Sequence, residues 1–228
     1  MPHNGLPLEW AGALASYGID EATLGRMVAH AYADHSRTWP IEAAAFRAYE
    51  LTSLAKVRVV VVGQDPYPSA KHATGVAFST GPQGAVSDAL RAIYANLSAD
   101  PSFLAPDHGN LEEWAARGAL LLNAALTLSP TSLSSRCTTW RSLLRATLAS
   151  VSATGRPIPF LLLGGKAHDL RTAVGDPSAV QAAGHPTPRN KVADRFPLFA
   201  NSRPFYDAND FLTSHGELPF DWSVASRP

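Results

Sequence analysis

Four short apolar runs, separated by stretches with helical periodicity, constrain the fold of this 228-residue chain more than any other feature. The runs are Val57–Val62, Ala119–Leu122, Pro159–Leu163 and Ala179–Ala183. Each is too short for a typical helix and is followed by glycine or a polar residue, which predicts strands. The Val- and Leu-rich composition of the first and third runs is typical of strands that are buried on both faces.

Helices are predicted between these runs, where apolar residues recur at intervals of three and four, in Asp88–Leu97, Leu111–Arg117, Trp140–Ser150 and Lys166–Val174. Two amphipathic stretches near the N-terminus, Glu21–His35 and Ile41–Leu51, predict helices on the outside of the molecule. Strands that alternate with helices pair in parallel through right-handed crossovers. We therefore expect an α/β fold, a three-layer αβα sandwich with a central four-stranded parallel sheet.

Residues 1–228 are expected to form a single domain, because 46% of them are hydrophobic and no repeat or long linker interrupts the pattern. The one cysteine, Cys137, cannot form an internal disulfide, which favours a reducing compartment. No apolar stretch approaches the ~20 residues that span a bilayer, so we expect no membrane partner. The eight histidines show no ligand spacing that predicts a metal site.

The formal net charge is zero, which by itself gives no electrostatic reason to expect a nucleic-acid partner. The charge is nevertheless unevenly distributed along the chain. Residues 136–203 carry 10 basic and 3 acidic side chains, whereas the flanking segments are net acidic. This pattern is compatible with one basic face, and equally with an ordinary solvated surface, since clustering in sequence need not become clustering in space.

Side chains that can take part in catalysis or binding follow the predicted strands, at the edge where parallel strands end and ligands bind. They lie in Gly63-Gln64-Asp65-Pro66-Tyr67-Pro68, at Asn123, in Gly164-Gly165-Lys166, and in Gly184-His185-Pro186-Thr187-Pro188-Arg189. Each alone has a structural explanation, such as an Asx-turn, a satisfied buried amide or a helix cap. Four coincident strand ends favour a functional site. No P-loop or dinucleotide-binding motif is present.

The order of these motifs resembles the uracil-DNA glycosylase family, in the branch without a metal or an iron–sulfur cluster. The resemblance extends from about Trp39 to Trp222. It is carried by Gln64-Asp65-Pro66-Tyr67, Gly75-Val76-Ala77-Phe78-Ser79, Leu120-Leu121-Leu122-Asn123 and His185-Pro186-Thr187-Pro188. It implies hydrolysis of the N-glycosidic bond of deoxyuridine in DNA after the nucleotide is flipped out of the duplex, with no cofactor.

The resemblance also implies a role for each matching residue. Asp65 would position the attacking water, and neutral His185 would donate to uracil O2, with the backbone of Gln64 as a second donor. Phe78 would stack on the base, Asn123 would read its edge, and Tyr67 would exclude the thymine methyl group. The remaining expected contacts are with the DNA backbone and groove, from Pro66, Gly165, Lys166, Thr187 and Arg189.

Three departures from the family pattern affect these expectations. Pro68 stands where the family usually has histidine, as in poxviral members, one of which is a polymerase accessory factor. Arg189 replaces the leucine wedge of the DNA-penetrating loop, so we expect extrusion to rely more on charge and a family protein inhibitor to bind weakly. Ser87-Asp88-Ala89 and Gly165 replace serine-containing phosphate contacts, part of which Lys166 would supply.

Two alternatives stay open at this stage. A catalytically weak DNA-binding or polymerase-accessory protein of the same fold would fit Pro68 and the lost serines. An aspartyl-phosphate hydrolase using Asp65 would need a second carboxylate two residues later, where the chain has Tyr67. The leading expectation is a monomeric repair enzyme in a bacterial-type cytoplasm, acting on uracil-containing DNA.

Overall fold

A four-stranded parallel sheet forms the centre of the computed structural model, which describes residues 5–33, 38–129, 137–187 and 196–225. Its strands are β1 (Val59–Gly63), β2 (Ala119–Asn123), β3 (Phe160–Leu163) and β4 (Val180–Ala183), in the order β2-β1-β3-β4. All three pairings are parallel, which confirms the predicted sheet. The register sets Gly63 beside Asn123 at the carboxyl end of β1 and β2.

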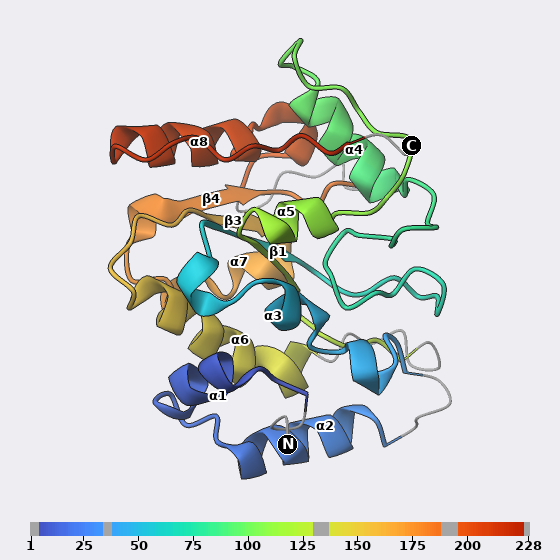
Figure 1. Ribbon diagram of the computed structural model, residues 1–228, viewed down its shortest axis with the longest axis vertical. Helices are drawn as coiled ribbons and strands as arrows, with labels where there is room; N and C mark the ends of the chain where they lie inside the picture. The colour runs from blue at the N-terminus through green and yellow to red at the C-terminus, as the bar shows by residue number, and fades with distance from the viewer. Residues whose placement is uncertain (1–4, 34–37, 130–136, 188–195, 226–228) are drawn as a thin grey trace.

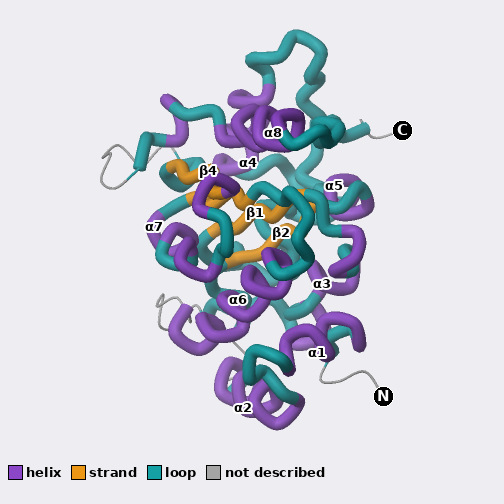
Figure 2. Tube along the Cα trace, turned by 90° about the vertical axis from the view of Figure 1, so that its left-hand side faces the viewer, coloured by secondary structure: helices purple, strands orange, loops and turns teal. Residues whose placement is uncertain are grey.

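Helices cover both faces of the sheet, as Figures 1 and 2 show. Val60 and Val62 face one layer, whereas Val59 and Val61 face the other, because side chains alternate along a strand. The first layer contains α1 (Leu8–Ala15), α2 (Glu21–Ala31), α3 (Arg47–Leu51), α6 (Cys137–Ser152) and α7 (Gly165–His168). The second contains α4 (Asp88–Leu97), α5 (Glu112–Ala116) and α8 (Pro204–Ser214). The three-layer αβα prediction is therefore confirmed.

The helices follow the sequence prediction closely in some places and depart from it in others. The predicted helix Asp88–Leu97 is α4 to the residue, because Ser87 caps it by accepting a hydrogen bond from the Leu90 amide. Lys166–Val174 is divided into α7 and a 3-10 turn, Arg171–Ala173, and Ile41–Leu51 into a 3-10 turn, Glu42–Ala44, and α3. The prediction omitted α1 and α8, which begin after Pro7 and at Pro204.

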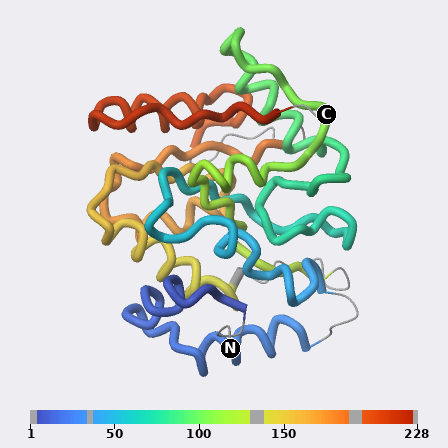
Figure 3. The backbone as a smooth tube through the Cα atoms, in the orientation of Figure 1, coloured from blue at the N-terminus to red at the C-terminus, as the bar shows by residue number. Residues whose placement is uncertain are grey.

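The two ends of the described chain lie in opposite helix layers, as the backbone trace in Figure 3 shows. Residues 217–225, here called the C-terminal strap, cross the second layer with Phe220, Trp222 and Val224 buried. The Trp114 indole of α5 donates a hydrogen bond of 2.8 Å to the Trp222 carbonyl. The strap is therefore part of the hydrophobic core rather than a free tail.

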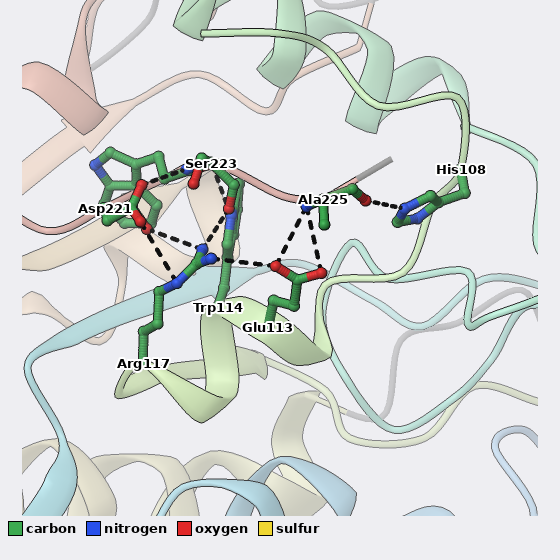
Figure 4. Close-up of polar contacts among 8 residues, drawn as sticks. His108, Glu113, Trp114, Arg117, Asp221, Ser223 and Ala225 are labelled. Carbon is green, nitrogen blue, oxygen red and sulfur yellow. Dashed lines mark hydrogen bonds and ion pairs between the residues drawn. The ribbon is translucent and has the colours of Figure 1, made fainter. Parts of the chain in front are cut away.

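Polar contacts also bind the strap to α5 and to the preceding loop (Figure 4). Arg117 forms ion pairs with Glu113, at 3.1 Å, and with Asp221 of the strap, at 3.6 Å. Glu113 accepts the Ala225 amide, and His108 Nε2 donates to the Ala225 carbonyl at 2.8 Å. These contacts hold the C-terminal strap against α5 and the loop before it.

No helix within the described ranges is long and apolar enough to cross a membrane.

Candidate active site

One cavity of about 300 Å³ opens at the carboxyl edge of the sheet and gathers most of the predicted site residues. The loop after β1 supplies Asp65, Pro66, Tyr67 and Phe78, β2 supplies Asn123, and the loop after β4 supplies His185. Pro68, His72, Ala73, Thr74, Gly75, Val76 and Ala89 complete the lining. Three of the four predicted strand ends therefore converge on a single space, as parallel pairing requires.

The carboxylate of Asp65 is held on one side only. Its Oδ2 accepts a hydrogen bond of 2.7 Å from the Gln64 side chain. Its Oδ1 is buried and has no hydrogen-bond partner within the described residues. The loop that carries it is anchored to the end of β2, because the Ala124 and Ala125 amides donate to the carbonyls of Gly63 and Gln64. A buried carboxylate oxygen of this kind is a strong acceptor for one further donor in the cavity.

Asn123 and Phe78 meet above Gly63, whose missing side chain makes room for both. A Cβ at this position would lie 2.6 Å from Asn123 Oδ1 and 3.0 Å from Phe78 Cζ. The amide therefore lies beside an aromatic face within the cavity. That combination can hydrogen-bond the edge of a planar heterocycle while the ring stacks on its face.

Phe78 has a φ of +63°, the left-handed region that non-glycine residues rarely adopt. Two backbone contacts hold this conformation. The Tyr67 hydroxyl donates to the Phe78 carbonyl at 2.9 Å, and the preceding amide, that of Ala77, donates to the Leu121 carbonyl at 3.1 Å. Strained backbone of this type persists only where the surroundings determine it, and it is concentrated at functional sites.

His185 faces the cavity as a neutral imidazole at pH 7. Burial lowers its pKa from the ordinary value of 6.5, and the nearby charge of Asp65 only partly opposes this effect. Its ring centroid is 6.1 Å from that of Phe78. The Gly164 backbone, with a φ of +102°, passes close by, since a Cβ there would lie 3.3 Å from His185 Cβ. A neutral imidazole in this position offers one N–H donor to a ligand.

Tyr67 lies against the cavity with its hydroxyl turned away into the protein. Besides the bond to Phe78, the hydroxyl pairs with Ser87 Oγ at 2.6 Å. Burial raises the pKa of Tyr67, which keeps its proton available for donation. The Tyr67 and His72 rings form an edge-to-face pair, with 6.2 Å between their centroids. The aromatic face and edge, rather than the hydroxyl, are therefore what Tyr67 presents to the cavity.

Of the residues predicted to contact DNA, only some are described, and one of them lines the cavity. Pro66 lines the cavity, whereas Gly165, Lys166 and Thr187 do not. Lys166 is exposed in the first turn of α7, and the Thr187 amide donates to the His185 carbonyl at 2.8 Å. Arg189 lies outside the described residues.

Among the residues that the sequence prediction did not include as site residues, Gly63, His72 and Ser87 have a marked influence on the cavity. Ser87 has a detectable signal, because serine directly before an amphipathic helix predicts an N-cap. Gly63 ends a buried strand and has a signal only once the register beside Asn123 is known. His72 lies in an irregular loop, where no periodicity indicates its direction.

A second cavity, of about 400 Å³, lies at the opposite edge, before β3 and β4. Its lining is mainly apolar, with Arg156, Asp176 and His215 as the charged or titratable members. Arg156 donates to three backbone carbonyls, those of Leu54, Ala55 and Val57. Despite its larger volume, this cavity contains none of the residues predicted from the strand ends. The described residues also contain no cluster of His, Cys, Asp and Glu that could hold a metal ion.

Comparison with known proteins places these features in context. Residues 50–213 match the model of the uracil DNA glycosylase superfamily. The chain is 35% identical to uracil-DNA glycosylase 1 of Streptomyces coelicolor, with 94% of each chain covered. It is 34% identical to the uracil-DNA glycosylase of Thermobifida fusca, with 94% of this chain and 92% of that protein covered.

Solved structures share the fold. The crystal structure of mimivirus uracil-DNA glycosylase superposes with a TM-score of 0.81 at 24% identity, covering 96% of this chain and 88% of that one. A variant of the mimivirus enzyme, solved in complex with UGI, gives the same TM-score and identity.

Proposed function

The chain belongs to the uracil DNA glycosylase superfamily and is a DNA glycosylase for uracil, and we propose that it hydrolyses the N-glycosidic bond of a flipped-out deoxyuridine with water positioned by Asp65. The observation that carries this mechanism is the convergence of Asp65, Asn123, Phe78 and His185 on one cavity. Its volume of about 300 Å³ is at the small end of ligand sites and suits one base with its sugar.

Recognition of the base rests on three side chains. The Asn123 amide offers a donor to uracil O4 and an acceptor to N3–H. Cytosine presents the opposite pattern and would leave both groups unpaired in a buried site, which opposes its binding strongly. Phe78 stacks on the base, and the Tyr67 ring occupies the space that the C5 methyl group of thymine needs.

The chemical step separates a cationic sugar from an anionic uracil. The charge of Asp65 favours the oxocarbenium-like sugar, and its buried Oδ1 is the oxygen available to orient the attacking water. His185, neutral because burial lowers its pKa, donates a hydrogen bond to uracil O2 as negative charge develops there. The backbone N–H of Gln64 is the second donor in this proposal. Water is the nucleophile, so the step needs no cofactor.

The proposal assigns contacts with the DNA backbone and groove to Pro66, Gly165, Lys166, Thr187 and Arg189. Lys166 is exposed after β3, and its ammonium group can reach a backbone phosphate beside the cavity. We expect the enzyme to act as a monomer in the cytoplasm. A protein inhibitor of the UGI type would bind weakly, because Arg189 replaces an apolar wedge with a charge.

The test is release of uracil from single- and double-stranded oligonucleotides in EDTA, followed as alkali-labile abasic sites. Asp65→Asn keeps the side-chain size and should lower the single-turnover rate by about 100-fold or more, as expected for loss of a water-positioning base. Asp210→Asn is the matched control, since Asp210 is exposed on α8 and pairs with Arg203; it should stay within about two-fold of wild type.

Three outcomes would contradict the proposal. An Asp65→Asn protein with full activity would refute the assigned mechanism. DNA binding without abasic sites in the wild-type protein would favour the accessory-protein alternative, and loss of activity in EDTA would favour a metal enzyme.

A further inference from the structure

Ser87 lies behind the base-binding cavity, not in its lining, yet it contacts the residue that defines one wall. Its Oγ is 2.6 Å from the Tyr67 hydroxyl and accepts the Leu90 amide of α4 at 3.1 Å. The side chain therefore caps a helix and binds Tyr67 at the same time. An N-cap role alone requires only the hydrogen bond from Leu90.

The direction of each hydrogen bond follows from counting protons. The Tyr67 hydroxyl has one proton, and it donates to the Phe78 carbonyl at 2.9 Å. The Ser87 proton is then the one that bridges the two hydroxyls, with Tyr67 as the acceptor. The result is a single directed chain from the Leu90 amide through Ser87 and Tyr67 to the carbonyl of Phe78. Each bond in such a chain polarises and strengthens the next.

This chain joins two walls of the cavity into one unit. Phe78, with its φ of +63°, is the only non-glycine residue with a positive φ in the described part of the structure. Its carbonyl is the acceptor at the end of the chain, so the contact that orients Tyr67 also holds the strained backbone of Phe78. The N-terminus of α4 is the fixed point, since Leu90 is fully buried in the second helix layer.

We propose that Ser87 is a positioning residue for base selection. It keeps the Tyr67 ring and the Phe78 backbone from moving aside when a base with a substituent at C5 enters the cavity. This inference rests on the proposed function, in which Tyr67 excludes the thymine methyl group. Steric exclusion of one methyl group works only against a wall that cannot move. Loss of the Ser87 hydroxyl leaves Tyr67 held only through its bond to the Phe78 carbonyl, which lowers that resistance without removing the ring.

The expected signature is a change in selectivity. In Ser87→Ala the rate of uracil excision falls by no more than about five-fold, whereas thymine excision relative to uracil rises by about ten-fold or more, in the range that one methyl group is worth in a pocket. Uracils with fluorine, chlorine and bromine at C5 should show a graded gain with substituent size. Each base is compared between variant and wild type, so its own leaving-group chemistry cancels.

Two controls separate positioning from stability. Asp20→Ala removes the N-cap of α2, where the Asp20 side chain accepts a hydrogen bond from the Thr23 amide far from the cavity. This variant should lose a similar free energy of unfolding and keep the wild-type selectivity. Ser87→Thr keeps both the cap and the bridging hydroxyl and should restore the wild-type ratio. Because Ser87 acts through the Tyr67 hydroxyl, Tyr67→Phe should relax selectivity, and adding Ser87→Ala to it should change the ratio by less than about two-fold.

The outcomes are distinguishable. If Ser87→Ala lowers excision of all bases equally, or leaves the thymine-to-uracil ratio within two-fold of wild type, the inference is overturned while the proposed function stands. If the wild-type protein releases no uracil, the proposed function fails and this inference fails with it.

Discussion

Gly63→Ala is the smallest change that tests how the base-reading amide is positioned. Gly63 closes β1 beside Asn123, and its carbonyl accepts the Ala124 amide at 2.9 Å, which fixes its backbone. Its φ is not in the left-handed region, so alanine adds no backbone strain. The only effect is space: the new Cβ would lie 2.6 Å from Asn123 Oδ1 and 3.0 Å from Phe78 Cζ.

The size of the effect follows from these distances. Ordinary van der Waals contact begins near 3.4 Å, so Oδ1 must retreat by about 0.8 Å. A shift of that size stretches a hydrogen bond of ~2.9 Å to more than ~3.5 Å, at which it is no longer made. Losing the pairing of a buried polar group costs about 1–3 kcal/mol, and misplacement near 1 Å in an active site costs about 100-fold. We therefore expect kcat/KM for uracil excision to fall about 30- to 300-fold, which corresponds to about 2–3.4 kcal/mol.

The assay is steady-state excision from a single-stranded oligonucleotide, together with urea denaturation to measure the free energy of unfolding. Gly12→Ala is the matched control, because Gly12 lies in α1 with no atom within 4 Å of its added Cβ. This control should keep full activity and gain up to about 1 kcal/mol of stability. A Gly63→Ala protein that stays folded and excises uracil within three-fold of wild type would refute the reasoning, either in the placement of the amide or in its role.

Burial of neutral His185 predicts that stability is lost as pH falls below 6.5, because the unfolded chain takes up a proton there before the folded protein does. The His185→Gln variant should therefore lose less free energy of unfolding between about pH 7 and pH 5 than wild type, and equal losses would contradict the assignment. Trp222→Ala should lower the free energy of unfolding by about 3–5 kcal/mol, since the indole is buried in the C-terminal strap, while uracil excision at low temperature changes little. A loss below about 1 kcal/mol in denaturant would show that the strap does not contribute to the core. Arg189→Leu should make duplex binding less dependent on salt, lowering the slope of log Kd against log salt by about one, and should strengthen binding of a UGI-type inhibitor. An unchanged slope would exclude a phosphate contact by this residue.

The sheet could be predicted from sequence because its signal is local. Runs such as Pro159–Leu163 are bounded by turn residues, and every residue of β3 is buried as their composition indicates. The omitted helix α8 also carries a helical pattern, since Phe205, Ala208, Phe211 and Leu212 recur at spacings of three and four and are buried on one face. Its burial depends on contacts with β3 and β4 that form only in the folded chain.

From strand ends alone, the convergence of three of the four predicted segments could be predicted, whereas Phe78 was predicted through the family resemblance. Asp65, Asn123 and His185 follow strands directly, so the direction of the sheet brings them together. The left-handed φ of Phe78 has no local signal, because phenylalanine gives no preference for that region. This conformation depends on a contact with the Tyr67 hydroxyl and on the bond from the Ala77 amide to Leu121 of β2, neither of which is local in sequence. The proposed role of Ser87 likewise depends on a contact with Tyr67 that forms only in the folded chain.

The distribution of charge limits how the enzyme holds DNA. The basic excess of residues 136–203 does not form one face throughout, because Arg156 lies at the opposite edge of the sheet, bound to backbone carbonyls. Arg203 is paired with two carboxylates, those of Asp207 and Asp210. Lys166 is an exposed cation of this segment in α7, just after the carboxyl end of β3. Phosphate contacts carry no information about the base, so in the proposed mechanism discrimination between bases comes from the cavity itself. In that mechanism base selection therefore depends on how rigidly Tyr67, Phe78 and Asn123 are held, which is what the variants of Gly63 and Ser87 test.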